Sequence, residues 1–362
     1  MVSSWQSEME EIGIYSAAGM PMEPLAGDAL PDVPLWVDLS HLTVIHVNGS
    51  EARDFLQGQF CNDLGLVEND QAQLSGYCTP KGRLLAIPIV LASESGFLLA
   101  VPDSVSEAFV KRLSMFVLRA DVSIAIKNDL VCTGLISDSA GNWGRGLASD
   151  LVLADKPLSA ANDSTVHIIN WQPIELEGVL RQRRLLIATE SQQLNDWQAH
   201  REIPKTSASL WRFGDIQQGV PSVVAATSDA FVPQMVNLQL IDALSFTKGC
   251  YPGQEIVARM QYLGKIKRHM QRFVMPLPDV ADTSLTPKQG DALVNGDDVN
   301  AGIVVDAVTI DDQVELLAVV KVSAATDTFT FQGGSLSTVA LPYELPSLVD
   351  GEVDCDSDQD QG

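Results

Sequence analysis

The residues best suited to chemistry lie in one short string, Lys248-Gly249-Cys250-Tyr251-Pro252-Gly253-Gln254-Glu255. Glycines on both sides of the cysteine, with a proline close by, indicate a tight exposed loop rather than the interior of a helix or strand. A cysteine held in such a loop can act as a nucleophile or as a metal ligand, and nearby cations favour its thiolate form. Because Lys248 precedes Cys250 by two residues, we predict a functional thiol at this position.

This string stands at the start of the one basic stretch in an acidic sequence. The 362 residues include 23 Lys and Arg against 47 Asp and Glu, which gives a formal net charge of −24. After Cys250 the sequence continues with Arg259, Lys265, Lys267 and Arg268. These cations would stabilise a thiolate, so we favour a functional Cys250 over the half-buried structural role that a lone cysteine usually has.

The cysteines as a set do not indicate a shared ligand group. None of the five forms a C-x-x-C pair; they are Cys61, Cys78, Cys132, Cys250 and Cys355. Their odd number and scatter argue against a disulfide framework and against a structural zinc site, so we assign no metal ligand with certainty. A permanently bound iron–sulfur cluster also needs clustered thiolates.

Charge and hydropathy limit the partners and the location. Nucleic acid carries dense negative charge, so direct RNA binding through residues 259–268 is disfavoured, although a local basic patch leaves it open. We find no apolar run of about 18 residues and therefore expect no membrane span. The start, MVSSWQSEMEEIG, lacks the basic and apolar regions of a secretion signal, so we expect a cytoplasmic protein.

The string at 248–255 resembles the K-G-C-[aromatic]-x-G-Q-E motif of the YgfZ family, relatives of the glycine-cleavage T-protein. Further family blocks occur earlier in the chain, and the resemblance extends over about residues 35–345. These blocks are Val47-Asn48-Gly49, Phe55-Leu56-Gln57-Gly58-Gln59 with Asn62-Asp63, residues 77–83, Trp211, Gly219-Val220-Pro221, residues 231–234 and Asn237-Leu238.

The resemblance implies a folate-binding body with an aminomethyltransferase-like fold, followed by a C-terminal β-barrel. It implies tetrahydrofolate or a one-carbon derivative as the cofactor. It also implies support of iron–sulfur cluster assembly, or of iron–sulfur enzymes such as tRNA methylthiotransferases. Trp211 matches a position that contacts folate in the family, and its flat face suits stacking on a pterin, while a core role is about equally open. A second family position, often Trp, falls at Leu42.

The sequence argues against the transfer reaction of the T-protein. That protein uses a carboxylate in a G-G-x-x-D-D segment, and the corresponding acidic positions here are Leu85 and Ala86. Neither side chain can accept a proton or stabilise a cation. We therefore expect an accessory protein in tRNA modification. The alternatives are a folate-dependent aminomethyltransferase, a one-carbon demethylase with a reactive Cys250, and an interaction module in which Cys250 is structural.

The hydrophobic pattern predicts an α+β protein. Helices are expected at 104–118, 192–201 and 207–218, with a short one after Ser50. Strands are expected at 42–47, 122–126, 131–136, 166–169 and 185–188, and as two arms within 74–92 that are joined by a turn at 79–82.

From about residue 271 the sequence changes to short β-rich runs separated by turns, which is typical of a small β-barrel or sandwich. We therefore divide the chain into a variable lead at 1–34, a folate-binding α+β region of two intertwined subdomains at 35–270, a C-terminal β-barrel at 271–347, and an acidic tail at 348–362 that we expect to be disordered.

Overall fold

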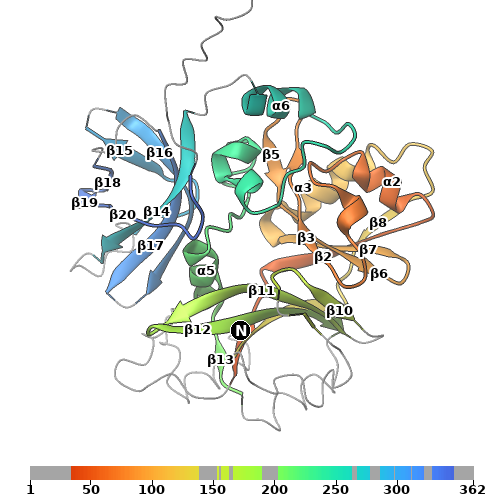
Figure 1. Cartoon of the computed structure of the whole chain (residues 1–362), viewed down its shortest axis with the longest axis horizontal. Helices are drawn as coiled ribbons and strands as arrows, with labels where there is room; N and C mark the ends of the chain where they lie inside the picture. The colour runs from red at the N-terminus through yellow and green to blue at the C-terminus, as the bar shows by residue number, and fades with distance from the viewer. Residues whose placement is uncertain are drawn as a thin grey trace, which may run out of the picture.

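The computed structural model describes most of the chain between residues 34 and 345. The described ranges are 34–137, 153–154, 156–162, 166–189, 203–262, 267–277, 286–296, 298–310, 312–321 and 328–345. Within them, three larger β-sheets are grouped around the helix α5 (Ala208–Gln217), as Figure 1 shows.

The six-stranded sheet combines strands that are far apart in the sequence. Its order is β10-β11-β12-β9-β1-β13, and β1 pairs antiparallel with β9 and parallel with β13. Because β1 leads directly into the five-stranded sheet but pairs with later strands, the two sheets are interleaved along the chain. The strands are β1 (Leu35–Asp38), β9 (Leu130–Ser137), β10 (Ala160–Asn162), β11 (Val166–Leu176), β12 (Val179–Thr189) and β13 (Lys205–Thr206).

The five-stranded sheet has the order β3-β6-β7-β2-β8, and its pairs are antiparallel. The strands are β2 (Leu42–Asn48), β3 (Gln73–Leu74), β6 (Ile89–Ser93), β7 (Gly96–Pro102) and β8 (Ser123–Ile126). Two helices contact it, α2 (Ala52–Gln57) and α3 (Asp103–Ser114), and they bury Leu56, Phe109 and Leu113 in a shared apolar core.

The arms predicted within 74–92 are each divided in two. Besides β3 and β6, the structure has a separate two-stranded sheet of β4 (Tyr77–Cys78) and β5 (Leu84–Ala86). The division lies where the Ser75 N–H donates to the Pro88 carbonyl (3.1 Å), since Pro88 itself has no N–H for a continuous ladder. The predicted turn at 79–82 is present, with the Gly82 N–H donating to the Thr79 carbonyl at 2.8 Å.

The C-terminal region is a seven-stranded sheet that nearly closes into a barrel. Its order is β19-β18-β15-β16-β17-β14-β20. The two ends approach each other, because β20 pairs with β14 while a Cβ on Gly334 in β19 would lie 2.7 Å from Met275 Sδ in β14. The strands are β14 (Arg268–Pro276), β15 (Ala292–Asn295), β16 (Asp298–Ile310), β17 (Gln313–Lys321), β18 (Thr330–Phe331), β19 (Gly334–Ser335) and β20 (Ser337–Val339).

These elements confirm the predicted class, α+β with a C-terminal barrel. The helix expected at 104–118 is α3, which ends at Ser114, and the following turn holds Leu118 at φ +48°, outside helical geometry. The helix expected at 207–218 is α5. The helix expected at 192–201 and the segments 1–33 and 348–362 lie outside the described residues. The remaining elements are η1 (Leu64–Leu66), η2 (Pro233–Val236), η3 (Leu238–Leu240) and α6 (Gln254–Tyr262).

A buried arginine joins α5 to the six-stranded sheet. Arg183 in β12 is 0% exposed, and its guanidinium donates to the carbonyls of Gln172 and Trp211, both at 2.6 Å. The same group pairs with Asp215 of α5 at 2.9 Å, and Asp215 also accepts a hydrogen bond from Trp171 Nε1 at 2.8 Å. One side chain therefore links two strands to the central helix.

We expect Arg183→Met to destabilise the protein by about 3–5 kcal/mol, because the substitution leaves Asp215 as a buried charge without its partner. Denaturant unfolding followed by tryptophan fluorescence measures the loss. The exposed Arg119 provides a matched control, and Arg119→Met should change stability by less than about 0.5 kcal/mol. A loss below about 1 kcal/mol for Arg183→Met would show that the guanidinium is not what holds α5 in place.

Candidate functional site

The motif loop at 248–255 places its cysteine at the surface. Of the four cysteines that the structure describes, Cys250 is exposed, while Cys61, Cys78 and Cys132 are buried. A Cβ added to the neighbouring Gly249 would meet no atom within 4 Å, so the chain stands clear of other protein on this side. The thiol is therefore open to a reagent or a partner from outside.

Two glycines fix the position of this loop against the β4–β5 turn. Gly82 and Gly253 have φ of +71° and +84°, in the left-handed region. A Cβ on Gly253 would lie 2.5 Å from the Thr79 carbonyl oxygen and 2.6 Å from the Gly82 Cα. Because backbone meets backbone here, two segments that resemble the same family lie in direct contact.

Lys248 faces into the protein. Its side chain is largely buried, and Nζ donates to the carbonyls of Gln57 and Phe60, each at 2.5 Å. The ammonium group also lies 5.3 Å from the centre of the Tyr251 ring. Burial lowers the pKa of Lys248 to about 8. Among the contacts of the described residues, Lys248 makes no hydrogen bond to Cys250, so it holds the loop rather than touching the thiol.

The basic stretch after the loop is exposed only in part. Arg259 is exposed on α6, Lys267 is exposed before β14, and Arg268 is partly buried at the start of that strand. Lys265 lies outside the described residues. Among the described residues of this stretch, the exposed cations are Arg259 and Lys267.

Buried amides connect the other family-like segments around the loop. Asn62 Nδ2 donates to the carbonyls of Leu74 (2.9 Å) and Asp242 (2.8 Å). Gln234 Nε2 donates to the Val257 carbonyl in α6 at 2.6 Å. Each amide bridges segments that are far apart in sequence, so the blocks recognised in the sequence converge on one structural unit.

Trp211 lies inside the protein. Its residue is 3% exposed, its ring centre is 6.2 Å from that of Trp171, and the Arg183 guanidinium lies 4.7 Å from the ring centre. A Cβ on Gly134 in β9 would lie 2.6 Å from the indole, so this strand needs glycine to accommodate the ring. Leu42, the other expected wall position, is partly buried at the start of β2 and packs on the same core.

A polar cluster beside Trp211 joins α5 to the barrel. Arg212 donates to both carboxylate oxygens of Asp306 in β16 and to the Ala307 carbonyl. Gln289 also donates to Asp306 (3.0 Å), and burial together with the nearby Arg212 lowers the pKa of His41, which lies between β1 and β2. Sequence reasoning missed this cluster, because its members are far apart in the chain and no spacing signals them.

The two positions that the family resemblance matches to the T-protein carboxylates lie in β5. Leu85 and Ala86 pack in the apolar core that also contains Phe60, Tyr77 and Phe109. These surroundings offer no acid or base at the two positions. Cys61 and Cys78 lie buried beneath the motif loop, and sequence analysis assigned them no role.

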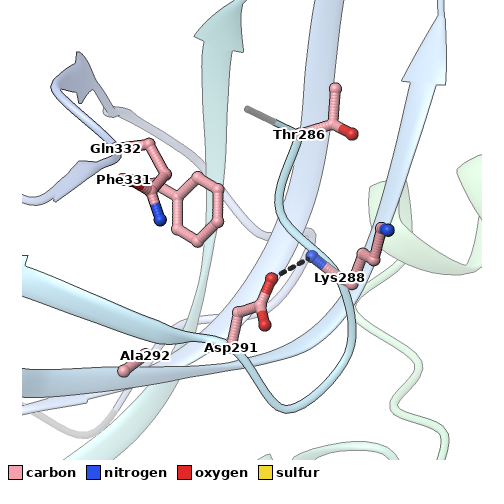
Figure 2. A pocket seen from close by; sticks show the side chains of 6 residues that line it. All are labelled: Thr286, Lys288, Asp291, Ala292, Phe331 and Gln332. Carbon is pink, nitrogen blue, oxygen red and sulfur yellow. Dashed lines mark hydrogen bonds between the residues drawn. The ribbon is translucent and has the colours of Figure 1, made fainter. Parts of the chain in front are cut away.

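A separate pocket of about 430 Å³ lies in the barrel, between the loop before β15 and the loop after β18. Figure 2 shows its lining, in which the Asp291 carboxylate accepts the Lys288 backbone N–H at 2.8 Å. None of its lining residues belongs to the motif loop. Within the described residues there is no group of three or more His, Cys, Asp or Glu placed to hold a metal, and none of the described helices is long and apolar enough to cross a membrane.

The arrangement of sheets around α5 occurs in a solved structure. Glycine cleavage system aminomethyltransferase T from Bartonella henselae superposes with a TM-score of 0.63, over 93% of this chain and 96% of that one, at 15% identity. The protein therefore has an aminomethyltransferase-like fold.

Sequence comparison identifies the family to which the chain belongs among proteins of this fold. The tRNA-modifying protein YgfZ of Colwellia psychrerythraea is 30% identical over 328 residues, which cover 87% of this chain and 95% of that protein. The protein of the same name from Edwardsiella ictaluri is 33% identical over 256 residues, with 68% and 72% covered. No family model matches the chain. Because the likeness to the Colwellia protein covers most of both chains, the chain belongs to the YgfZ family.

We expect Gly253→Ala to destabilise the protein by about 2–4 kcal/mol, because the added methyl group meets backbone and the left-handed φ is strained for alanine. Gly249→Ala is the matched control in the same loop and should change stability by less than about 1 kcal/mol, since its methyl group enters open space. Urea unfolding measures the free energy of unfolding of both variants. Equal losses of stability would contradict the contact between Gly253 and the β4–β5 turn.

The buried Lys248 should give a distinct pH dependence. Its pKa is about 8 in the folded protein against an ordinary value of 10.5, so between these values the unfolded chain binds the extra proton. Stability therefore rises with pH through this window, and wild type should gain roughly 1–3 kcal/mol relative to Lys248→Met between pH 8 and 10.5. Unfolding curves of both proteins at matched pH measure this difference, and a flat difference would show that the lysine titrates normally.

Proposed function

We propose that this protein is a folate-binding accessory protein that supports iron–sulfur enzymes of tRNA modification, including methylthiolation, with Cys250 as its functional thiol. The observation that carries the proposal is the convergence of the family-like segments on one loop, which presents an exposed cysteine. The names of the relatives, tRNA-modifying proteins, support the tRNA context.

The geometry around Cys250 favours a functional thiol over a structural one. Buried cysteines stabilise by packing, whereas Cys250 is exposed beside open space. Its loop is nevertheless held in place through Lys248 and Gly253. A cysteine on a rigid, accessible loop suits contact with a partner, and its sulfur would supply one ligand to a cluster whose other ligands come from that partner.

Folate enters the proposal through the fold and the family resemblance. Trp211 as placed here does not fit direct stacking on a pterin, because the ring is buried against Trp171 and the Arg183 guanidinium. We therefore assign Trp211 to the support of α5, and we place the folate site beside α5, near the junction that Arg212 and His41 mark. The cofactor would be tetrahydrofolate or a one-carbon derivative of it.

The environment of β5 supports an accessory role over aminomethyl transfer. Leu85 and Ala86 lie in an apolar core, where the T-protein reaction would need a carboxylate. A one-carbon demethylase that uses Cys250 is the second candidate, because the exposed thiol could react with an electrophilic carbon. We expect the protein to act in the cytoplasm, through an enzyme partner rather than through direct binding of tRNA.

Substitution of Trp211 tests its assignment. We expect Trp211→Ala to lose about 3–5 kcal/mol of stability, the usual range for a buried tryptophan. Trp211→Phe should fold and keep its tetrahydrofolate affinity within about twofold, since the phenyl ring still fills the core. Unfolding curves measure the stability of each variant, and calorimetric titration with tetrahydrofolate measures its affinity. A stable Trp211→Phe variant that binds more than about tenfold more weakly would show that the indole contacts folate after all.

Complementation tests the thiol. In cells that lack the protein, we expect Cys250→Ser to abolish the restoration of tRNA methylthiolation, because a serine hydroxyl does not ligate iron as a cysteine sulfur does. Thr247→Ala, at an exposed position in the same segment, serves as the control and should restore methylthiolation fully. Mass spectrometry of tRNA nucleosides gives the readout, with immunoblotting to confirm equal protein levels. Full activity of Cys250→Ser would make the loop purely structural.

A further inference from the structure

A turn of exposed apolar residues follows α3 and has no role in the proposed function. Among the described residues nine large apolar side chains are exposed, and three of them fall within four consecutive positions. Met115 is 66%, Phe116 is 39% and Leu118 is 88% exposed. Single exposed apolar residues are common on soluble proteins, whereas a group of them side by side is typical of a binding surface. We call residues 115–118 the apolar turn.

Hydrogen bonds hold the apolar turn in one conformation. The Met115 N–H donates to the Arg112 carbonyl at 3.2 Å, and the Phe116 N–H donates to the Leu113 carbonyl at 3.1 Å. The Arg112 guanidinium also lies 5.9 Å from the centre of the Phe116 ring, within the range of a cation–π contact. The exposed side chains are therefore presented in a fixed arrangement at the end of α3.

Leucine at position 118 benefits neither the backbone nor the core. The φ of Leu118 is +48°, in the left-handed region, where a Cβ is unfavourable and glycine is not. Its side chain is almost fully exposed, so packing does not offset this cost. Residues held in an unfavourable backbone conformation cluster at sites of binding and catalysis. The folded chain by itself therefore gains nothing from this leucine, which suggests that its contacts are made with another molecule.

Two exposed cations without an acidic partner flank the apolar turn. Within the part of the chain that the structure describes, the side chains of Lys111 and Arg119 form no ion pair or hydrogen bond. Acids are plentiful, since the chain has 47 Asp and Glu against 23 Lys and Arg. The nearby Asp121 is engaged elsewhere, because its carboxylate accepts the Ser50 hydroxyl at 2.7 Å. Lys111 also suits the last turn of α3, but Arg119 lies beyond the helix.

We propose that the apolar turn, together with Lys111 and Arg119, is a docking surface for an acidic amphipathic helix of a protein partner. Apolar side chains of that helix cover Met115, Phe116 and Leu118, and a few carboxylates beside them pair with the two cations. None of these residues belongs to the motif loop, so the inference does not rest on the role proposed for Cys250.

Other occupants fit the charges of this surface less well. In a symmetric contact with a second copy, Lys111 and Arg119 would face the same two cations. RNA and an anionic membrane both present extended negative charge, which a protein of net charge −24 repels. A short helix with few carboxylates meets the two cations alone.

A peptide of defined chemistry tests the surface. The probe is a fluorescein-labelled peptide of about 15 residues with leucines at helical spacing, a few glutamates beside them, and Ala and Gln elsewhere. One matched peptide has Ser for every Leu, and the other has Lys for every Glu. Fluorescence anisotropy with the full-length protein at low salt measures binding. We expect the Leu/Glu peptide to bind at least about tenfold more tightly than either matched peptide. Equal binding of the three peptides, or no binding of any, overturns the proposal.

Variants of the protein locate the binding on this surface. Leu118→Gly should weaken the Leu/Glu peptide at least about tenfold without lowering the urea midpoint, because glycine adopts the left-handed φ freely. The double variant Lys111→Glu with Arg119→Glu should prefer the Leu/Lys peptide instead. Val299→Ser, at an exposed apolar position of the barrel, is the control and should bind as wild type does. Unchanged binding by Leu118→Gly would refute the docking surface.

Three further results would assign the surface to another occupant and overturn the proposal. The first is a rise of more than about tenfold in peptide affinity when residues 348–362 are removed, which would mean that the acidic tail covers the turn. The second is a dimer in sedimentation that Leu118→Gly dissociates. The third is binding to phosphatidylglycerol vesicles that Leu118→Gly abolishes. We expect none of them, and peptide affinity should be the same with and without the tail.

Discussion

The buried ammonium group of Lys248 is the contact on which the candidate site depends. It donates to the carbonyls of Gln57 and Phe60, which lie 191 and 188 residues away along the chain, at the end of α2. Carbonyls at the end of a helix lack partners within the helix, and a positive charge is favoured there. A single side chain therefore fastens the motif loop to the five-stranded sheet's helix, and the loop can expose its cysteine without becoming loose.

A second buried cation, Arg183, holds distant segments of the body of the protein together in a similar way. Arg183 fixes α5 to the six-stranded sheet, while Arg212 on the same helix reaches Asp306 in the barrel. The central helix is thus tied to both neighbours by charged hydrogen bonds rather than by apolar packing alone. A buried charge without its partner costs several kcal/mol, about 3–5 when one member of a pair is lost. Arrangements of the sheets that separate these partners are therefore disfavoured, which fixes the relative position of the sheets.

The fold and the exposed loop could be predicted from the sequence because their signals are local. Glycine and proline around Cys250 indicate an exposed turn, and the hydrophobic pattern gives α5 and the barrel strands. The inward direction of Lys248 could not be predicted, since its acceptors come from a distant segment. The same holds for Trp211, whose burial depends on Gly134 and Arg183. The division of the strands within 74–92 was missed, although Pro88 is its local cause.

The use of cations inside the protein bears on the proposed role in tRNA modification. Lys248, Arg183 and Arg272 are buried or nearly so, and each is engaged with a carbonyl or a carboxylate. The pairs of Arg183 with Asp215 and of Arg272 with Glu315 are neutral, so they do not offset the formal net charge of −24, and the field outside the protein is negative. Such a surface repels a polyanion such as RNA. A protein partner with a small acidic patch can still contact the exposed cations Arg259 and Lys267. The charge distribution thus supports the proposed link to tRNA through an enzyme partner over direct binding of RNA.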